Sequence, residues 1–278
     1  MPDTSGSLMR RAPRGARLLL VMTLWAVWAA RAGAQQPGPQ PLAAPSDSPE
    51  FLTRYDFQLS GAAIAIDDKR FSWDTHFGGA LDVVDYGRGR ASIVADYQAM
   101  LGSQFRPFDP NQAYYTLEVS GSVWAGPIEI AGVFHHISRH LSDRPKRAAI
   151  AWNVLGARVL RQVSIGGTTL GVRGGAGRIL QHALVDYSWT ADLDLVVRRS
   201  LDERVGVYAR ASGELFGIDS ASSDRGTQRD GRFEAGVRLN GRAGAVELFA
   251  GYERRVDADP FARLPLQWAL AGFRLVNK

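Results

Sequence analysis

The stretch that decides the fold is residues 126–160, GPIEIAGVFHHISRHLSDRPKRAAIAWNVLGARVL. It predicts one β-hairpin, in which an apolar strand leads into a polar loop at 141–147 and a second apolar strand returns. Side chains in both strands alternate between a more polar and a more apolar face, with a period of two. The same alternation runs from Phe51 onward, so this hairpin is the repeating unit of an all-β fold.

The alternation predicts about twelve strands, joined by links of two lengths. The predicted strands start near Tyr55, Trp73, Arg90, Ala113, Pro127, Ala148, Gln162, Ile179, Leu184, Arg204, Arg229 and Leu264, with 245–253 as an alternative strand if 162–186 is divided wrongly. Short links at 87–89, 125–127, 200–203 and 240–242 alternate with longer ones at 102–112, 141–147, 218–230 and 256–263. Short turns at one end and long loops at the other indicate a transmembrane antiparallel up-and-down β-barrel over 51–278.

A soluble β-sandwich or a lipocalin-like barrel shares this alternation. The chain also ends on Asn277 and Lys278 rather than on the terminal phenylalanine that closes many outer-membrane barrels. The membrane barrel is favoured because segments of about ten residues match a tilted spanning strand, and because closure removes the open edges that lipid cannot satisfy. Aromatic residues near the segment ends, such as Tyr187, Trp189 and Trp268, are expected to lie at the membrane interfaces.

The N-terminal residues predict export and not a part of the fold. Residues 1–34 have the three parts of a signal peptide: an arginine-rich start, the apolar run 18–30, and the cleavage site Ala32-Gly33-Ala34. The apolar run is shorter than the roughly twenty residues that a spanning helix needs. Residues 35–50 contain five prolines and predict a solvated, extended linker. We therefore expect the barrel in the outer membrane of a Gram-negative cell envelope.

Composition excludes several partners and chemistries. The chain has a formal net charge of +5, of which the predicted signal peptide supplies about +4, so the exported chain carries about +1. A nucleic-acid partner needs a clustered basic surface and is not expected. The chain has no cysteine, which excludes disulfides, zinc–thiolate sites and thiol catalysis.

The hairpin also carries polar residues on its apolar, lipid-directed face. Residue parity places His136 and Ser138 on this face of the outgoing strand and Asn153 on the same face of the returning strand. With the loop centred between Arg144 and Pro145, His136 lies opposite Asn153 at about 5 Å, and Ser138 lies about 6.6 Å further along. Polar groups on a lipid-directed face are costly and therefore indicate a function. A serine, a histidine base and an amide that fixes its tautomer are suited to nucleophilic acyl transfer.

The sequence His136-x-Ser138, followed by Trp152-Asn153, resembles the Ser-His-Asn hairpin of the outer-membrane phospholipase A family, whose members are twelve-stranded barrels with a triad on the lipid-facing wall. The resemblance covers about twenty residues, and Arg139-His140 stand where the family has Asn-Gly. It implies Ser138 as the nucleophile, His136 as the base and Asn153 as the orienting residue. It also implies calcium as a cofactor and a dimer.

The interpretation that the sequence favours assigns no catalysis, and the lipid acyl hydrolase (phospholipase or lipid A deacylase) is its alternative. The segment HHISRHLSD, residues 135–143, also resembles a motif in outer-membrane proteins of unknown function, which implies no activity. The histidines would then be interfacial residues, beside basic residues that contact lipopolysaccharide phosphate: His135, His136, His140, Arg139, Arg144, Lys146 and Arg147. The protein would be a structural, lipid-interacting or narrow-pore barrel. Lumen charges of both signs predict a salt-bridged plug more than a selective pore: Asp192, Asp194, Arg198, Arg210, Glu214, Arg232, Glu234 and Arg238.

Other candidate sites are weaker. His136 and His140 lie four residues apart on a strand, too far to share a metal ion readily. The glycine-rich segment 171–177 superficially resembles a phosphate loop, but no helix follows it, so we interpret it as a turn or kink. Acids that could bind calcium lie in the last two long loops, at Asp219, Asp224, Asp257 and Asp259.

Overall fold

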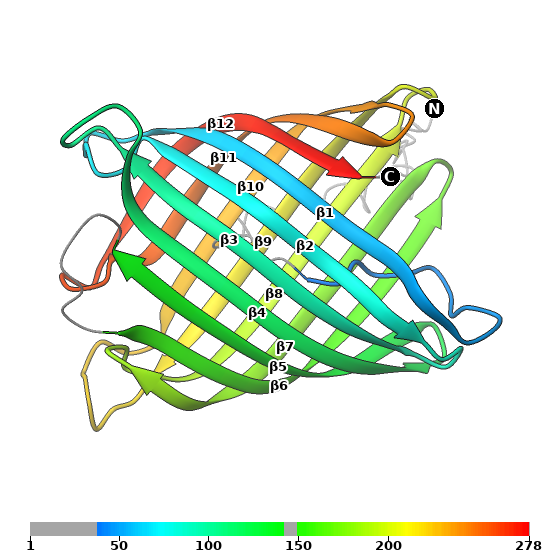
Figure 1. Ribbon diagram of the computed structural model, residues 1–278, viewed down its shortest axis with the longest axis horizontal. Coiled ribbons are helices and arrows are strands. Elements are labelled where there is room, and N and C mark those ends of the chain that lie inside the picture. Colours follow the sequence, from blue (N-terminus) through cyan, green and yellow to red (C-terminus); the bar gives the residue numbers. More distant parts are fainter. Residues whose placement is uncertain (1–37, 142–148, 278) are drawn as a thin grey trace, which may run out of the picture.

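The computed structural model describes residues 38–141 and 149–277, which form a closed barrel of twelve antiparallel strands (Figure 1). Each strand pairs with its neighbours in sequence, and β1 closes on β12. The strands are β1 Glu50–Ala65, β2 Trp73–Asp85, β3 Arg90–Gly102, β4 Asp109–Ala125, β5 Ile128–Leu141, β6 Ile150–Ile165, β7 Thr168–Ala183, β8 Tyr187–Ser200, β9 Val205–Ile218, β10 Gln228–Asn240, β11 Gly244–Asp259 and β12 Leu264–Asn277. The predicted all-β up-and-down barrel and its strand number are confirmed. The predicted signal peptide at 1–34 lies outside the described residues.

One part of the strand division is wrong. The predicted strand starts at Gln162 and Ile179 are replaced by the single strand β7, and the remaining strand is β11. The segment 171–177 is regular strand and not a turn or kink. Its glycines weaken the alternation in the sequence but allow close packing, since a Cβ added at Gly177 would lie 2.5 Å from Cγ1 of Val154 on β6.

The links between the strands differ in length at the two ends of the barrel. At the end where β1 starts and β12 finishes, the described links are two to four residues long (Figure 1). At the other end the links contain three to nine residues. Outer-membrane barrels have short periplasmic turns and longer extracellular loops, so we call these the periplasmic and the extracellular end.

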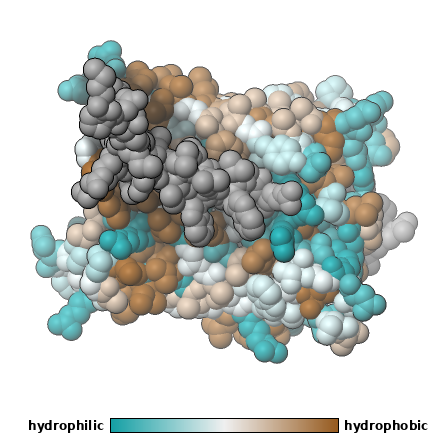
Figure 2. Space-filling view, turned by 180° about the vertical axis from the view of Figure 1, so that it is seen from behind, coloured by the Kyte–Doolittle hydropathy of each residue, from teal (hydrophilic) through white to brown (hydrophobic). Residues whose placement is uncertain are grey.

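The outer wall of the barrel is apolar, and its interior is polar. Figure 2 shows apolar side chains on parts of the one side of the outer wall that is in view. Large exposed apolar side chains come from strands all around the barrel, among them Phe77, Ile93, Leu117, Phe134, Leu155, Leu193, Phe233, Leu248 and Phe273. Across the described ranges the chain has no helix long and apolar enough to cross a membrane. Because a soluble sandwich or lipocalin-like barrel would bury its apolar face and expose its polar one, this wall excludes both alternatives.

The lumen is filled by ion pairs through its middle. Arg158 pairs with Glu118 at 2.5 Å, and Arg90 lies 2.8 Å from both Asp82 and Glu129. The predicted plug of charges is present as well, with contacts such as Arg210 to Asp194 at 3.1 Å and Arg232 to Glu234 at 3.3 Å. These pairs cross-link the walls and leave little room for a selective channel.

Aromatic and aliphatic side chains fill the extracellular part of the lumen. Trp268 stacks on Phe71 with ring centroids 5.7 Å apart, and Trp152 meets Tyr187 edge-on at 5.5 Å. Trp268 and Tyr187 were expected in the membrane interface, and for both this is wrong because they are buried inside. For Tyr187 the reason is a register shift between Tyr187 and Trp189 in the pairing of β8 with β9, which turns Tyr187 inward while Trp189 stays outside.

The described part of the predicted linker begins inside the barrel. Gly38 and Pro39 are buried, and Arg90 donates a hydrogen bond of 2.7 Å from Nη2 to the backbone oxygen of Gln40. The expected full solvation of residues 35–50 therefore does not hold for 38–41. From residue 43 to the start of β1 the chain is exposed, as expected.

Candidate functional site

The candidate site lies on the outer wall, near the extracellular ends of β5 and β6. On β5, the side chains of His135, Ile137 and Arg139 are buried in the lumen, whereas His136 and Ser138 are half-buried and face outward. The parity expected from the sequence is therefore present. The alternation of inward and outward side chains is unbroken here because β5 has no register shift in its pairing with β4 or β6.

His136 and Asn153 lie directly opposite each other, as the hairpin register predicts. The His136 Nδ1 atom is 2.6 Å from the Asn153 Oδ1 atom. On its other side, Asn153 donates a hydrogen bond of 3.2 Å from Nδ2 to Oε1 of Gln181 on β7. The three polar side chains form a hydrogen-bonded row across three strands.

This row fixes the tautomer of His136. An amide oxygen can only accept a hydrogen bond, so Nδ1 of His136 must carry the proton. The Gln181 contact in turn orients the amide of Asn153 so that its oxygen faces the imidazole. In the neutral imidazole, Nε2 of His136 is then the ring nitrogen with a free lone pair, which is the arrangement that a general base requires.

Ser138 lies on the same face as His136, two residues nearer the extracellular end, which corresponds to about 6.6 Å along the strand. Within the described residues its hydroxyl has no hydrogen bond to His136, so the structure joins two of the three predicted site residues directly. Ser138 pairs across β4 with Tyr115, whose ring lies 5.0 Å from Tyr97 and 5.2 Å from His140. These rings flank the serine on the outer wall.

The described residues do not form a calcium site beside Ser138. Hard cations take oxygen ligands, chiefly carboxylates. The described outward faces of β4, β5, β6 and β7 carry none, and no group of three or more potential metal ligands occurs among the described residues. No chemical step can therefore be assigned to calcium from these residues.

The loop acids proposed as calcium ligands have other partners. Asp257 pairs with Arg225 at 2.6 Å, and Asp259 pairs with Arg70 at 2.5 Å. Asp219 closes its own turn by accepting hydrogen bonds from the Ser222 hydroxyl and the Ala221 backbone, which lower its pKa. Asp224 is exposed.

Two residues of the lipopolysaccharide interpretation also point inward. Arg139 donates hydrogen bonds to Gln112 and to the backbone oxygen of Ala258 inside the barrel. His135 lies 3.7 Å from Glu118 in the lumen. Neither can contact lipid on the outer wall, so this interpretation is wrong for both. Arg144, Lys146 and Arg147 lie outside the described residues.

Gln181 was not predicted as a site residue from the sequence. Its partner Asn153 is adjacent to a register shift between β6 and β7, which changes the parity expected for the end of β7. The only available signal was a polar residue near the end of an apolar segment, in a region whose strands were divided wrongly. Without the register, this glutamine could not be placed beside Asn153.

A closed twelve-stranded barrel with an apolar outer wall and a polar interior is a bacterial outer-membrane β-barrel. No protein-family model matches the chain, and no curated protein matches it.

Several solved structures are similar. Outer-membrane phospholipase A from Escherichia coli has 9% sequence identity and a TM-score of 0.49, over 82% of this chain and 98% of that chain. LpxR from Salmonella typhimurium has 8% identity and a TM-score of 0.45, over 79% of this chain and 99% of that chain. The Acinetobacter baumannii outer-membrane protein Omp33 has 9% identity and a TM-score of 0.39, over 81% of this chain and 97% of that chain. Similarity at this level carries no argument about activity.

Proposed function

We propose that this barrel is a lipid acyl hydrolase, with Ser138, His136 and Asn153 as its catalytic residues. The observation that carries the proposal is the 2.6 Å contact between His136 Nδ1 and Asn153 Oδ1 on the lipid-facing wall. Placing polar side chains against lipid costs free energy, so their presence at this position supports a function. The substrate class is an ester-linked lipid of the outer leaflet, either a phospholipid or lipid A.

The residues divide the reaction as follows. Nε2 of His136 takes the proton from the Ser138 hydroxyl as its oxygen attacks the ester carbonyl. His136 then gives that proton to the departing alcohol oxygen, which leaves an acyl group on Ser138. Water, deprotonated by the same nitrogen, releases the fatty acid and restores the serine. Asn153 keeps the imidazole in the required tautomer throughout.

The position of the site suits a lipid substrate. His136 and Ser138 lie near the extracellular end of β5, where the ester groups of outer-leaflet lipids are expected. The rings of Tyr97 and Tyr115 lie on the side of Ser138 toward β3 and β4. Aromatic rings favour this boundary between acyl chains and headgroups, so they can border a bound lipid.

A structural barrel without activity is the second candidate. The observation that favours it is that the Ser138 hydroxyl makes no hydrogen bond to His136 within the described residues. A pore is less well supported, because ion pairs and aromatic side chains occupy the lumen.

Hydrolysis of phospholipid and of lipid A by the refolded full-length barrel tests the proposal. The assay compares wild type, Ser138→Ala and a control, Ser164→Ala, at an exposed serine near the periplasmic turn. It is run with calcium chloride and with a chelator, because the family resemblance implies calcium. We expect fatty acid release by wild type and by the control, and loss of release with Ser138→Ala. No release by wild type in either buffer, or equal release by Ser138→Ala, would reject the hydrolase.

A further inference from the structure

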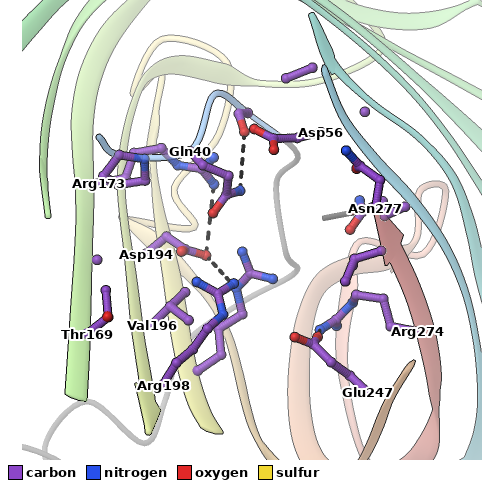
Figure 3. Close-up of a pocket in the computed structure, with 18 of the residues that line it drawn as sticks. Gln40, Asp56, Thr169, Arg173, Asp194, Val196, Arg198, Glu247, Arg274 and Asn277 are labelled. Atoms are coloured by element: carbon purple, nitrogen blue, oxygen red, sulfur yellow. Dashed lines mark hydrogen bonds and ion pairs between the residues drawn. The ribbon is translucent and has the colours of Figure 1, made fainter. Parts of the chain in front are cut away.

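A cavity of about 300 Å³ opens inside the periplasmic half of the barrel (Figure 3). Its wall includes residues of β1, β7, β8, β9, β11 and β12, and the N-terminal segment 38–41 forms one side. Its charged lining is unequal, with five arginines against three carboxylates: Arg173, Arg198, Arg210, Arg238, Arg274, Asp56, Asp194 and Glu247. We call this cavity the arginine vestibule.

The excess positive charge is concentrated on β7, β8 and β9. Arg210 lies 3.1 Å from Asp194, and Arg173 lies 3.9 Å from the same carboxylate. Arg198 on β8 also lines the vestibule. It lies two residues beyond Val196, the β8 residue that pairs with Arg210 on β9. Arg173 and Arg210 therefore share one carboxylate, and Arg198 adds a third guanidinium group to this part of the wall.

Arg198 differs from the other arginines of the vestibule. Arg238 and Arg274 both pair with Glu247, at 2.8 and 2.9 Å. Arg198 makes no ion pair in the described part of the chain, and its Nε atom is buried without a hydrogen-bond partner there. A buried N–H donor without a partner is costly, and an anionic ligand that accepts a hydrogen bond from this Nε would remove that cost.

The N-terminal segment packs against the arginine vestibule, where Arg173 and Arg210 are buried and Arg198 is half-buried. Gly38 lies so close to Arg173 that a Cβ added to it would come 2.3 Å from Nη1. The backbone at Gly38 therefore covers one edge of the Arg173 guanidinium group. Figure 3 shows Gln40 beside Arg173 and Asp194, with Arg198 further along the same wall.

We propose that the arginine vestibule binds a phosphate group through Arg198, with Arg173 and Arg210 as further ligands. Guanidinium groups match the geometry of phosphate oxygens and bind them with charge-assisted hydrogen bonds. The cavity is larger than inorganic phosphate alone, so a small phosphate monoester also fits. This site is separate from the outer wall and does not depend on the proposed hydrolase.

Titration calorimetry on the refolded full-length barrel in maltoside micelles, which contain no phosphate, tests the site. Inorganic phosphate and glycerol 3-phosphate are the two probes, and they distinguish a phosphate-ion site from a monoester site. The variants are Arg198→Gln, Arg198→Lys and a matched control, Arg199→Gln, whose side chain is exposed on β8. The heat-dependent mobility of the barrel on gels verifies folding.

Wild type is expected to bind at least one probe saturably. Arg198→Gln should weaken binding at least about 10-fold, since one charged hydrogen-bond partner is lost, whereas Arg198→Lys and Arg199→Gln should stay within a few-fold of wild type. Absence of saturable binding of both probes to folded wild type would overturn the proposal. Equal weakening by Arg198→Gln and Arg199→Gln would also overturn it, because it would show only a general effect of charge.

Discussion

His136 and Asn153 are joined side chain to side chain across β5 and β6, with 2.6 Å between Nδ1 and Oδ1 on the outer wall of the barrel. Gln181 holds the same amide from β7 at 3.2 Å. Each of the two contacts restrains the orientation of the Asn153 amide. The row therefore keeps the imidazole in a single orientation and tautomer, and it links the fold to the proposed chemistry.

Removal of Gln181 should slow the reaction without abolishing it. In Gln181→Leu the amide of Asn153 is free to turn, so its oxygen no longer always faces His136. We expect kcat to fall roughly 10-fold with little change in KM, and Asn153→Ala to cause a larger fall, on the order of 100-fold. Leu180→Ala, at an exposed neighbour, is the control. An unchanged kcat in Gln181→Leu would show that the glutamine does not position the site.

The buried pair of Arg158 and Glu118 should matter for stability. Glu118→Ala leaves a buried guanidinium without its carboxylate, and we expect a loss of about 3–5 kcal/mol in the free energy of unfolding. Exposed Glu203 is the matched control, and Glu203→Ala should change the free energy of unfolding by less than about 0.5 kcal/mol. Urea titrations followed by tryptophan fluorescence measure both. If Glu118→Ala equals the control, the pair is not a structural element of the lumen.

The barrel should not conduct ions. Ion pairs such as Arg90 with Glu129 fill the middle of the lumen, and stacked rings such as Trp268 with Phe71 fill its extracellular part. In planar bilayers, we expect wild type to insert without steady current steps, while a general porin added to the same bilayer conducts. Reproducible single-channel steps from wild type would show that the lumen opens and would support a pore.

The loop at 219–227, at the extracellular end of the barrel, should be held less firmly in acid. Arg225, from the loop between β9 and β10, bridges Asp186 at 2.8 Å and Asp257 at 2.6 Å, and Arg263 also lies 2.8 Å from Asp186. Burial alone would raise the pKa of Asp186, but the hydrogen bonds and charges of Arg225 and Arg263 hold it below its ordinary value of 3.8. Stability from a lowered carboxyl pKa is complete above the ordinary value and is lost as the pH falls through the folded pKa.

Hydrogen exchange in the loop at 219–227, corrected for intrinsic rates, measures this loosening. We expect protection that is constant above about pH 4 and decreases below it. Asp186→Asn should reduce protection at neutral pH and remove much of the acid dependence. A wild-type loop whose protection is the same at neutral pH and below the folded pKa would contradict the role of Asp186.

The alternation of side chains was sufficient to predict the barrel, its strand number and the outward position of His136 and Ser138. It was also sufficient to pair His136 with Asn153, because a short hairpin has few registers. It failed where the two-residue period is broken. The glycines of β7 hid one strand, and irregular pairing turned Tyr187 inward and brought Gln181 beside Asn153. The ion pairs of the lumen join strands far apart in sequence, so only the closed barrel defines them.

The central claim is that Ser138 is a nucleophile activated by His136. A lipid-like fluorophosphonate tests it most directly, because an activated serine oxygen displaces fluoride and keeps the phosphonyl group. Mass spectrometry of the digested, labelled barrel should show one adduct on the peptide that contains Ser138, and the adduct should be absent from His136→Ala. No adduct at Ser138 in wild type, or an equal yield in His136→Ala, would contradict the claim.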